Sequence, residues 1–492
     1  MARGKRRDSS VGSGALWSGI NTLVMRVANV AIMVVAVRLV SPRDFGVFTA
    51  ALVVGTIATS MSELGVASAL IRRDLSVSEL GPTVVTIAWV WSGSLAIMMV
   101  AGARPLADLL GAPDAETSIR VLALGVAASG FSAVPGALLA RDFRQRSIFT
   151  AGALAFVPSS AVLVLLAFGG SGPLSFAWSK VVTAVVTGAV MLILGKQWVR
   201  PRFERRAFQF LLRFGVPLAA ANVVGYALLN ADFALVGHAM GPALLGVYSV
   251  AFSIASLAVS ILSSALNSVA MPAFSNHAGA SEGLRGSLRV WGSAVFFIGL
   301  PVCGFTSVFS REVVSVLYGH PWAAAGPVVA VLALYGVPML FELMLSNLLV
   351  AIGRTGAALL VQCVWIVALS LGMLIGLNTM GLVGVGWAHV VVLLAVVIPV
   401  QVVLVRRLAP GVLQGLWQVT GRPLVGTCLA AISAFIVCIP VSVDWLRLSV
   451  GGVVGGVVYL GCTRPLWRDR LLSPRSKGNH RREVSDAPTR AQ

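Results

Sequence analysis

Charged side chains inside apolar stretches are the residues of this sequence best placed to do chemistry. Four such residues interrupt long apolar runs: Arg26, Lys180, Asp232 and Glu342. Burying a charge in an apolar medium is costly, so residues of this kind commonly bind a substrate or an ion. The plainer alternative is that they pair with neighbours or reach the membrane surface. The two cations suit an anionic substrate, and the two carboxylates suit gating or coupling.

We predict that the cations bind substrate with the help of nearby amides. Arg26 would be the main anchor, because a guanidinium can hold phosphate oxygens through two parallel hydrogen bonds. The amides that would support Arg26 and Lys180 are Asn21, Asn29 and Asn222. Amides in membrane helices also join helices to one another, and the sequence leaves both uses open.

Composition places these residues in a membrane. Of the 492 residues, 57% are hydrophobic and 11% are charged, whereas a soluble domain carries about 25% charged residues. Apolar runs of about 20 residues recur along the chain, and a helix of that length crosses a bilayer. The runs do not alternate as barrel strands do. The sequence therefore predicts an all-α integral membrane protein.

We predict about fourteen transmembrane helices from these runs. Their approximate ranges are 14–38, 46–70, 83–103, 119–140, 148–169, 174–195, 212–236, 243–266, 289–309, 326–350, 357–377, 382–405, 422–441 and 445–463. The first run is too long for the core of a signal peptide and lacks a small-residue cleavage site. We therefore expect it to be a membrane helix like the others.

Basic residues assign the two sides of the membrane. With the N-terminus in the cytoplasm, 29 of the 37 Lys and Arg residues fall in cytoplasmic segments, six fall outside and two lie within runs. Because cytoplasmic loops are enriched in these residues, we predict a multi-pass protein of the plasma (inner) membrane with both termini cytoplasmic. The net charge of +19 then serves topology and contact with anionic membrane lipids, and we expect no nucleic-acid partner.

The sequence offers no candidate residues for enzyme chemistry. Its five cysteines are scattered in or beside apolar runs and suit packing. No cluster of His, Cys, Asp and Glu has the spacing of a metal site, and no Gly-rich phosphate loop occurs in the sequence. The loops are also short for a catalytic domain. We expect a protein that is not an enzyme and needs no cofactor or metal.

A short internal repeat divides the chain. Leu39–Ala51 and Ala239–Ala251 align at an offset of 200 with four identities. Each segment joins the first two helices of a six-helix half, where Pro and Gly suit a tight turn; a turn shared by unrelated hairpins is the alternative. We predict two six-helix lobes, runs one to six and seven to twelve, plus two C-terminal helices. The lobes would be parallel repeats about an axis normal to the membrane, which suits alternating access.

Domain boundaries follow from the runs. They are a cytoplasmic N-terminus (1–13), a first lobe (14–195), a cytoplasmic linker (196–211), a second lobe (212–405), two further helices (422–463) and a basic cytoplasmic tail (464–492) that we expect to be disordered. Lys180 and Asp232 fall at similar depths near the predicted outer face, on different lobes. We expect them to pair when the outer mouth closes and to separate when it opens. Glu342, inside the tenth run, is the other candidate for gating or coupling.

Motifs in both halves resemble one family. The resembling motifs are Pro42-x-x-Phe45-Gly46 after the first run, Glu63-Leu64-Gly65 near the end of the second, the basic loop Pro135–Ser147, and Asp232 and Gly237 before Leu245-Gly246-x-Tyr248. Together they are similar to bacterial polysaccharide flippases, the Wzx-type members of the multidrug/oligosaccharidyl-lipid/polysaccharide exporter superfamily. Family members more often have Asp at the position of Glu63.

The resemblance implies a transporter that flips a polyprenyl-pyrophosphate-linked oligosaccharide from the inner to the outer leaflet for export of lipopolysaccharide or exopolysaccharide. Related flippases of peptidoglycan precursors carry a functional Arg in the first helix, which Arg26 matches by helix and depth. The family also implies a lipid-tail groove at the last two helices, and it makes a glycan polymerase and glycosyltransferases candidate partners. One alternative is a drug or metabolite exporter of the same superfamily, which the cations Arg26 and Lys180 disfavour. A second is a non-transporting scaffold of a glycan-assembly complex.

Overall fold

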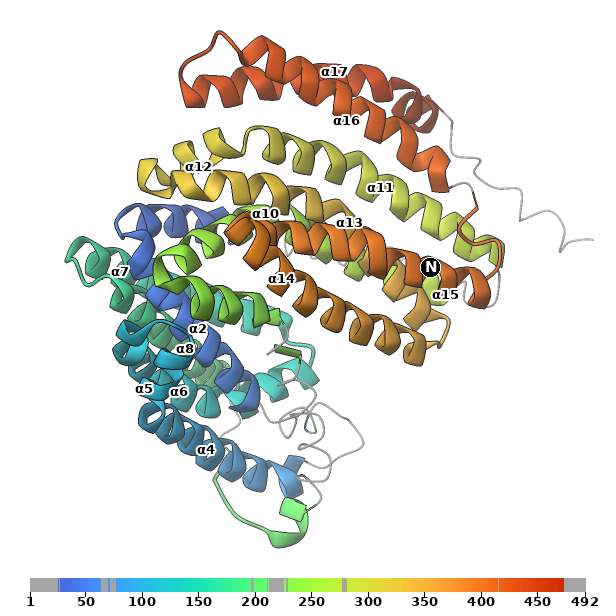
Figure 1. Cartoon of the computed structure of the whole chain (residues 1–492). Coiled ribbons are helices and arrows are strands. Elements are labelled where there is room, and N and C mark those ends of the chain that lie inside the picture. The colour runs from blue at the N-terminus through green and yellow to red at the C-terminus, as the bar shows by residue number, and fades with distance from the viewer. Residues whose placement is uncertain are drawn as a thin grey trace, which may run out of the picture. The chain divides into compact units, whose positions relative to one another are not determined.

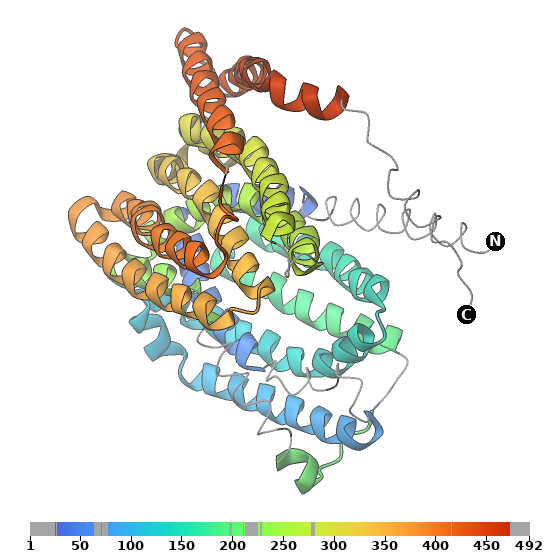
Figure 2. The ribbon, with the colours of Figure 1, turned by 90° about the vertical axis from the view of Figure 1, so that its right-hand side faces the viewer.

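The structure is a computed structural model composed of helices. It describes residues 25, 27–62, 70, 77–195, 199–209, 211, 225–226, 229–276, 281–414 and 416–472. In these ranges the elements are helices and none is a strand (Figures 1 and 2). The predicted all-α class is therefore confirmed.

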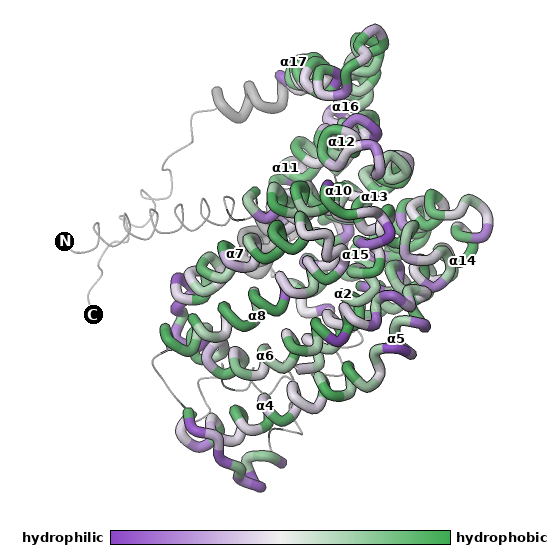
Figure 3. Tube along the Cα trace, turned by 90° about the vertical axis from the view of Figure 1, so that its left-hand side faces the viewer, coloured by the Kyte–Doolittle hydropathy of each residue, from purple (hydrophilic) through white to green (hydrophobic). Residues whose placement is uncertain are grey.

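The described long helices coincide with predicted runs, while the start of the first run (14–38) and most of the seventh (212–236) lie outside the described residues. Their bounds are α2 (Pro42–Ser62), α4 (Val77–Ala101), α6 (Glu116–Arg141), α7 (Gln145–Phe168), α8 (Pro173–Gly195), α10 (Ala231–Asn276), α11 (Ser281–Val308), α13 (Gly326–Ala351), α14 (Thr355–Val392), α15 (Ile398–Leu408), α16 (Leu416–Cys438) and α17 (Asp444–Leu472). Eleven helices of the described ranges are long and apolar enough to cross a membrane, and a shorter apolar helix covers Val27–Arg38. Hydrophobic residues predominate along them (Figure 3). The total of fourteen and the two-lobe layout stay predictions.

Two glycines separate helices that run on without a loop. Gly241 (φ 78°) interrupts α10, and Gly381 (φ 60°) interrupts α14. A positive φ strains any residue with a Cβ atom, so glycine is favoured at both breaks. Beside the second break the backbones touch, because a Cβ atom at Gly376 would lie 2.3 Å from the carbonyl oxygen of Gly384. The breaks fall between the predicted seventh and eighth runs and between the eleventh and twelfth.

Short helices occupy two segments that the sequence analysis treated as loops. α5 (Ala103–Leu109) and a 3-10 turn, η1 (Pro113–Ala115), lie between α4 and α6, while α12 (Ser310–Tyr318) and η2 (His320–Ala325) lie between α11 and α13. A search for runs of about 20 apolar residues cannot find elements this short. In each predicted lobe, a short helix and a 3-10 turn follow the third long helix. The order of elements is therefore the same in the two halves of the chain.

Contacts divide the chain into two compact units. The first comprises Met1–Ile254, Val313–Leu332 and Cys363–Val392, and the second comprises Ala255–Glu312, Ala333–Gln362 and Leu393–Gln492. In the first unit α6 packs against α4 and α8, and α8 packs against α7; in the second α16 packs against α11 and α17. Each candidate site lies within one unit.

Candidate functional site

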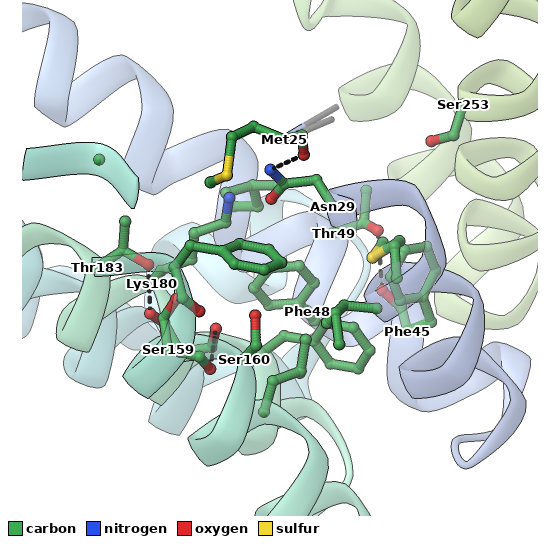
Figure 4. Close-up of a pocket in the computed structure, with 18 of the residues that line it drawn as sticks. Met25, Asn29, Phe45, Phe48, Thr49, Ser159, Ser160, Lys180, Thr183 and Ser253 are labelled. Atoms are coloured by element: carbon green, nitrogen blue, oxygen red, sulfur yellow. Dashed lines mark hydrogen bonds between the residues drawn. The ribbon is translucent and has the colours of Figure 1, made fainter. Parts of the chain in front are cut away.

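A cavity of about 520 Å³ lies in the first unit among the first helix, α2, α7, α8 and α10 (Figure 4). Its lining mixes hydroxyl groups and an amide with aromatic rings. The polar members include Asn29, Thr49, Ser159, Ser160, Lys180 and Thr183, and the aromatic ones include Phe45, Phe48 and Phe176. A cavity with convergent polar groups among apolar walls is the usual form of a small-molecule site.

Lys180 supplies a positive charge to this cavity. Its side chain extends from α8 toward Met25 and Asn29 of the first helix (Figure 4). Among the described residues Lys180 forms no ion pair. It also borders a second cavity of about 250 Å³, which is lined by hydroxyl groups such as those of Thr56 and Thr59. A cation that faces open space and has no carboxylate beside it is available to an anionic ligand.

The sequence of α8 explains why Lys180 faces the cavity. Phe176 and Thr183 of the same helix line the cavity with Lys180. They lie four residues before and three residues after Lys180, and these spacings place side chains on one helical face. Ser179, the neighbour of Lys180, donates from its Oγ to the carbonyl of Ser159 on α7 at 2.9 Å. This bond joins α8 to α7 next to Lys180 and, with the packing of the two helices, restrains the rotation of the helical face that carries Lys180.

Aromatic rings continue from the cavity wall into a buried cluster. Ring centroids are 5.0 Å apart for Phe48 and Phe176, 5.3 Å for Phe45 and Phe176, and 5.8 Å for Phe45 and Trp322 of η2. All four rings are buried. Tilted and offset ring pairs at these distances attract one another. The aromatic cluster therefore makes a dense, water-excluding block next to the cavity.

Helices α2 and α10 meet beside this block at two glycines. A Cβ atom at Gly46 would lie 1.6 Å from the carbonyl oxygen of Pro242, and a Cβ atom at Gly246 would lie 2.0 Å from that of Pro42. Only glycine permits backbones to approach so closely. The residues in contact are the same Pro and Gly of the internal repeat, 200 positions apart. Each repeat thus contacts the other through equivalent residues, as subunits do about a two-fold axis.

One helical turn after the two glycines, a polar contact again joins residues 200 positions apart. Thr49 Oγ1 donates to Ser249 Oγ at 3.3 Å, and these residues also differ by 200. Both hydroxyls are buried, so each partly satisfies the other in an apolar setting. The 13-residue repeat is therefore a place where the halves of the chain meet, and a resemblance between unrelated hairpin turns would not require that.

Each half also caps a short helix of the other. Arg38 donates from Nε to the carbonyl of Leu317 at 2.7 Å and from Nη2 to that of Val316, near the end of α12. His238, its counterpart 200 residues on, places Nδ1 2.8 Å from the carbonyl oxygen of Leu109, which ends α5. Basic side chains at a helix C-terminus donate hydrogen bonds to its free carbonyl groups and interact favourably with the negative end of the helix dipole. The two caps extend the reciprocal contact on both sides of the glycine crossing.

Asp232 is buried in the first unit, with partners that differ from the expected one. Tyr248 donates its hydroxyl to Asp232 Oδ2 at 2.8 Å, and His389 Nε2 lies 3.9 Å from the same oxygen. The predicted ion pair with Lys180 is not formed among the described residues. Asp232 instead turns toward aromatic neighbours of its own half, whereas Lys180 turns toward the cavity. The pairing hypothesis is therefore wrong for this conformation.

The remaining predicted site residues are dispersed. Asn29 lines the cavity, and its Nδ2 donates to the carbonyl of Met25 at 2.7 Å. Glu342 lies in the second unit and accepts a hydrogen bond from Ser346 at 2.8 Å. Arg26, Asn21 and Asn222 fall outside the described residues. The structure therefore brings together Asn29 and Lys180 in one cavity.

Several residues of these contacts give little signal in the sequence. Arg38 and His238 were not considered as a pair, although the offset of 200 that relates the repeat segments also relates them. Gln401, which contacts Glu342, gave no signal beyond being a polar residue in an apolar run. Trp322 was placed in a loop, and its burial depends on the fold of η2.

A protein-family comparison gives a match over much of the chain. A family model described as "Polysaccharide biosynthesis protein" matches residues 34–327. The chain is 27% identical over 340 residues to the lipopolysaccharide biosynthesis protein WzxC of Escherichia coli (strain K12), with 66% of each chain covered. It is 26% identical over 303 residues to the succinoglycan biosynthesis transport protein ExoT of Rhizobium meliloti (strain 1021), with 60% of each covered. The chain thus spans slightly less than two thirds of the length of these relatives.

Solved structures share the fold. A structure described as the lipid II flippase MurJ in an inward closed conformation superposes with a TM-score of 0.73 at 13% identity, covering 93% of this chain and 100% of that one. A multidrug resistance MATE family transporter in an inward-facing conformation gives a TM-score of 0.62 at 19% identity, covering 77% and 93%. At these identities the likeness concerns architecture alone.

Proposed function

The chain belongs to the polysaccharide biosynthesis protein family, and on that premise we propose that it flips a polyprenyl-pyrophosphate-linked oligosaccharide from the inner to the outer leaflet of the plasma membrane. The headgroup of such a lipid carries a charged pyrophosphate and sugars, which cannot cross hydrocarbon unaided. A protein that moves it needs a polar cavity, a cation and a path that opens to one side at a time. It needs no covalent chemistry of its own.

The observation that carries the proposal is Lys180 in the hydroxyl-lined cavity of the first unit. An ammonium group that forms no ion pair within the described part of the chain attracts phosphate, and the hydroxyls of Ser160 and Thr183 can bond sugar hydroxyls. The half-buried rings of Phe149 and Phe156, which also line the cavity, offer flat apolar faces to the C–H groups of a sugar ring. Arg26, by family resemblance, and Asn21, Asn29 and Asn222 would complete the binding site.

An apolar pocket in the second unit supports a place for the lipid tail. It measures about 400 Å³ and lies among α11, α16 and α17, where its lining includes Phe305, Ala430, Gly452 and Leu460. Two of its glycines, Gly455 and Gly456, leave room that side chains would fill. We infer that a prenyl segment occupies it, because the lining is apolar and large enough for several carbon units.

The reciprocal contact of the two repeats supports alternating access. Loop charges assign the start of α2 and the Gly241 break to the outer face. The glycine crossing, the aromatic cluster and the caps of Arg38 and His238 would then close the outer mouth in this conformation. We propose that the lobes 14–195 and 212–405, joined by the linker 196–211, part at this crossing to release the headgroup. Asp232 and Glu342 would take part in gating or coupling, and a polymerase and glycosyltransferases would be the functional partners.

Topology is testable with single cysteines in a chain whose five native cysteines are replaced. We expect Ser171→Cys, between α7 and α8, to react with an impermeant thiol reagent added to whole cells. Arg202→Cys, in the basic linker, should react only after the cells are opened. Labelling in the reverse pattern would place both termini outside and would invert the proposed direction of transport. Equal expression of the two variants is the required control.

Loss of the gene in its own host tests the proposed function. We expect surface polysaccharide to disappear and polyprenyl-pyrophosphate oligosaccharide to accumulate in the inner leaflet, because synthesis continues while transfer stops. Mass spectrometry of lipid extracts and immunodetection of surface glycan measure the two effects, and a plasmid copy should reverse both. Intact surface glycan with raised sensitivity to cationic drugs would instead indicate a drug exporter. Loss of glycan without accumulated precursor would indicate a scaffold.

A further inference from the structure

The second unit contains a buried carboxylate surrounded by amides and a hydroxyl. Glu342 of α13 is 4% exposed, and its Oε1 accepts from Ser346 Oγ at 2.8 Å and from Gln362 Nε2 of α14 at 3.5 Å. Gln401 of α15 is fully buried. Its Nε2 lies 3.3 Å from the same Oε1 and 3.0 Å from Ser346 Oγ. The cluster joins three successive helices around one acidic group.

No basic side chain of the described ranges balances this carboxylate. Glu342 takes part in no ion pair among those residues, and the groups that donate to Oε1 are neutral. Neighbouring members of the core, including Leu340, Met344 and Val405, are apolar and fully buried. Neutral hydrogen bonds reduce the cost of a buried negative charge but do not cancel it. The carboxylate therefore needs a positive partner that the described side chains do not supply.

Gln401 brings an unsatisfied oxygen to the cluster. Its Oε1 is buried and has no hydrogen-bond donor in the described structure, a condition that is rare in proteins. The amide could also be turned over, since its oxygen and nitrogen exchange places with little change in shape. Oε1 would then face Glu342 Oε1, and two acceptors in contact need a proton or a metal ion between them. In the first orientation the buried Oε1 of Gln401 lacks a donor, and in the second it faces the carboxylate oxygen of Glu342 with no positive group between them.

The backbone before Gln401 departs from a regular helix. Leu393–Val397 forms a single π turn, η3, and Pro399 comes after it with no N–H for the helical ladder. A π turn holds an extra residue and so rotates the helical segment after it relative to the segment before it. Such turns are rare and occur mostly at functional sites. Here the π turn precedes α15, a helix rich in valine, and the one amide of that helix, Gln401, points at Glu342.

We propose that Glu342, Ser346 and Gln401 bind a small monovalent cation, either Na⁺ or a proton carried by the Glu342 carboxyl group. Carboxylate, amide and hydroxyl oxygens are the ligands that hard cations prefer. A proton on Glu342 would equally neutralise the charge and, with the Gln401 amide turned over, would supply a donor to Gln401 Oε1. A single carboxylate supplies one negative charge, which matches one positive charge. The site is independent of what the chain transports.

Thermal unfolding of the purified full-length protein tests the site. Wild type is compared in NaCl, KCl and choline chloride at equal ionic strength, each at mildly alkaline and mildly acidic pH. A cation that binds only the folded state should raise the unfolding midpoint by on the order of 5 °C. Glu342→Gln and Gln401→Leu should lose this response. Glu282→Gln and Gln414→Leu, which make the same exchanges at exposed positions of the same unit, should retain it.

The pattern of responses separates the two cations. A rise specific to NaCl that both cluster variants lose identifies Na⁺, and equilibrium binding of radiolabelled sodium should give the same result. A rise on acidification that is indifferent to salt, and that Glu342→Gln loses, identifies a proton. If Gln401→Leu fails to fold, Glu342→Asp serves instead, because it keeps the charge and should weaken the response. No response in wild type, or equal responses in wild type and Glu342→Gln, would overturn the proposal.

Discussion

Leucine in place of Gly46 is expected to abolish export of the surface glycan while the protein still reaches the membrane. A Cβ atom there would lie 1.6 Å from the carbonyl oxygen of Pro242 and 2.8 Å from the amide nitrogen of Gly246. Both are backbone atoms, so the clash can be relieved only if α2 and α10 move apart. Overpacking commonly costs about 1–3 kcal/mol and sometimes more. A strain near the upper figure would shift a two-state equilibrium by on the order of 100-fold toward the open outer mouth.

The same reasoning makes Gly246 the partner test. A Cβ atom at Gly246 would lie 2.0 Å from the carbonyl oxygen of Pro42, so Gly246→Leu should have the same effect as Gly46→Leu. Gly93→Leu is the matched control, because nothing lies within 4 Å of a Cβ atom at Gly93 in α4. Gly93→Leu adds the same side-chain volume as the two crossing variants but at a position where it meets no neighbour.

Two measurements characterise the Gly46 and Gly246 variants. Immunodetection reports surface glycan, and an impermeant thiol reagent reports access to Ser160→Cys in the cavity. We expect labelling from outside to be faster in both glycine variants than in the parent chain and in Gly93→Leu. Normal glycan export by well-expressed Gly46→Leu would contradict the role of the crossing. Damage by only one of the two glycine variants would contradict its reciprocal character.

Elements of the fold followed from local patterns in the sequence. Apolar runs identified the long helices because hydrophobic length alone determines whether a segment can cross a bilayer. Pro42 and Gly46 marked a turn and, with Pro242 and Gly246, a repeat. The mutual contact of those residues could have been proposed, since parallel repeats about a two-fold axis bring equivalent surfaces together. A turn motif explains the same residues locally, so their presence in the sequence does not by itself require the contact.

The partners of the charged residues could not be read from the sequence. Depth along a helix placed Lys180 and Asp232 near each other, but rotation about the helix axis decides which way each side chain points. Packing fixes that rotation, as the bond between Ser179 and Ser159 shows for α8. Gln401 depends further on the π turn of Leu393–Val397, and no periodicity of apolar residues reveals such a turn. Contacts between helices thus required the structure, whereas the helices themselves did not.

Loss of the charge at Lys180 is expected to have an effect as large as that of the glycine variants. Two unit charges about 4 Å apart interact by about 4 kcal/mol at the effective dielectric constant of a partly wet site. Part of that energy is offset by desolvation, so we expect Lys180→Met to lower the export rate by on the order of 100-fold. Lys180→Glu should be worse, because it repels a pyrophosphate. Lys180→Arg should retain much of the activity, since it keeps the charge and can bond phosphate.

The series at Lys180 also separates an anionic substrate from a cationic one. Accumulated lipid-linked precursor and surface glycan are measured for each variant, with Arg354→Met as a control that removes a basic residue from an exposed position. If the substrate is anionic, export should fall in the order Lys, Arg, Met, Glu at position 180. A chain that expels organic cations would show the opposite trend, because an added carboxylate in the cavity attracts them. Equal export by wild type and Lys180→Met, at equal protein level, would remove Lys180 from the headgroup site and with it the observation on which the proposed function depends.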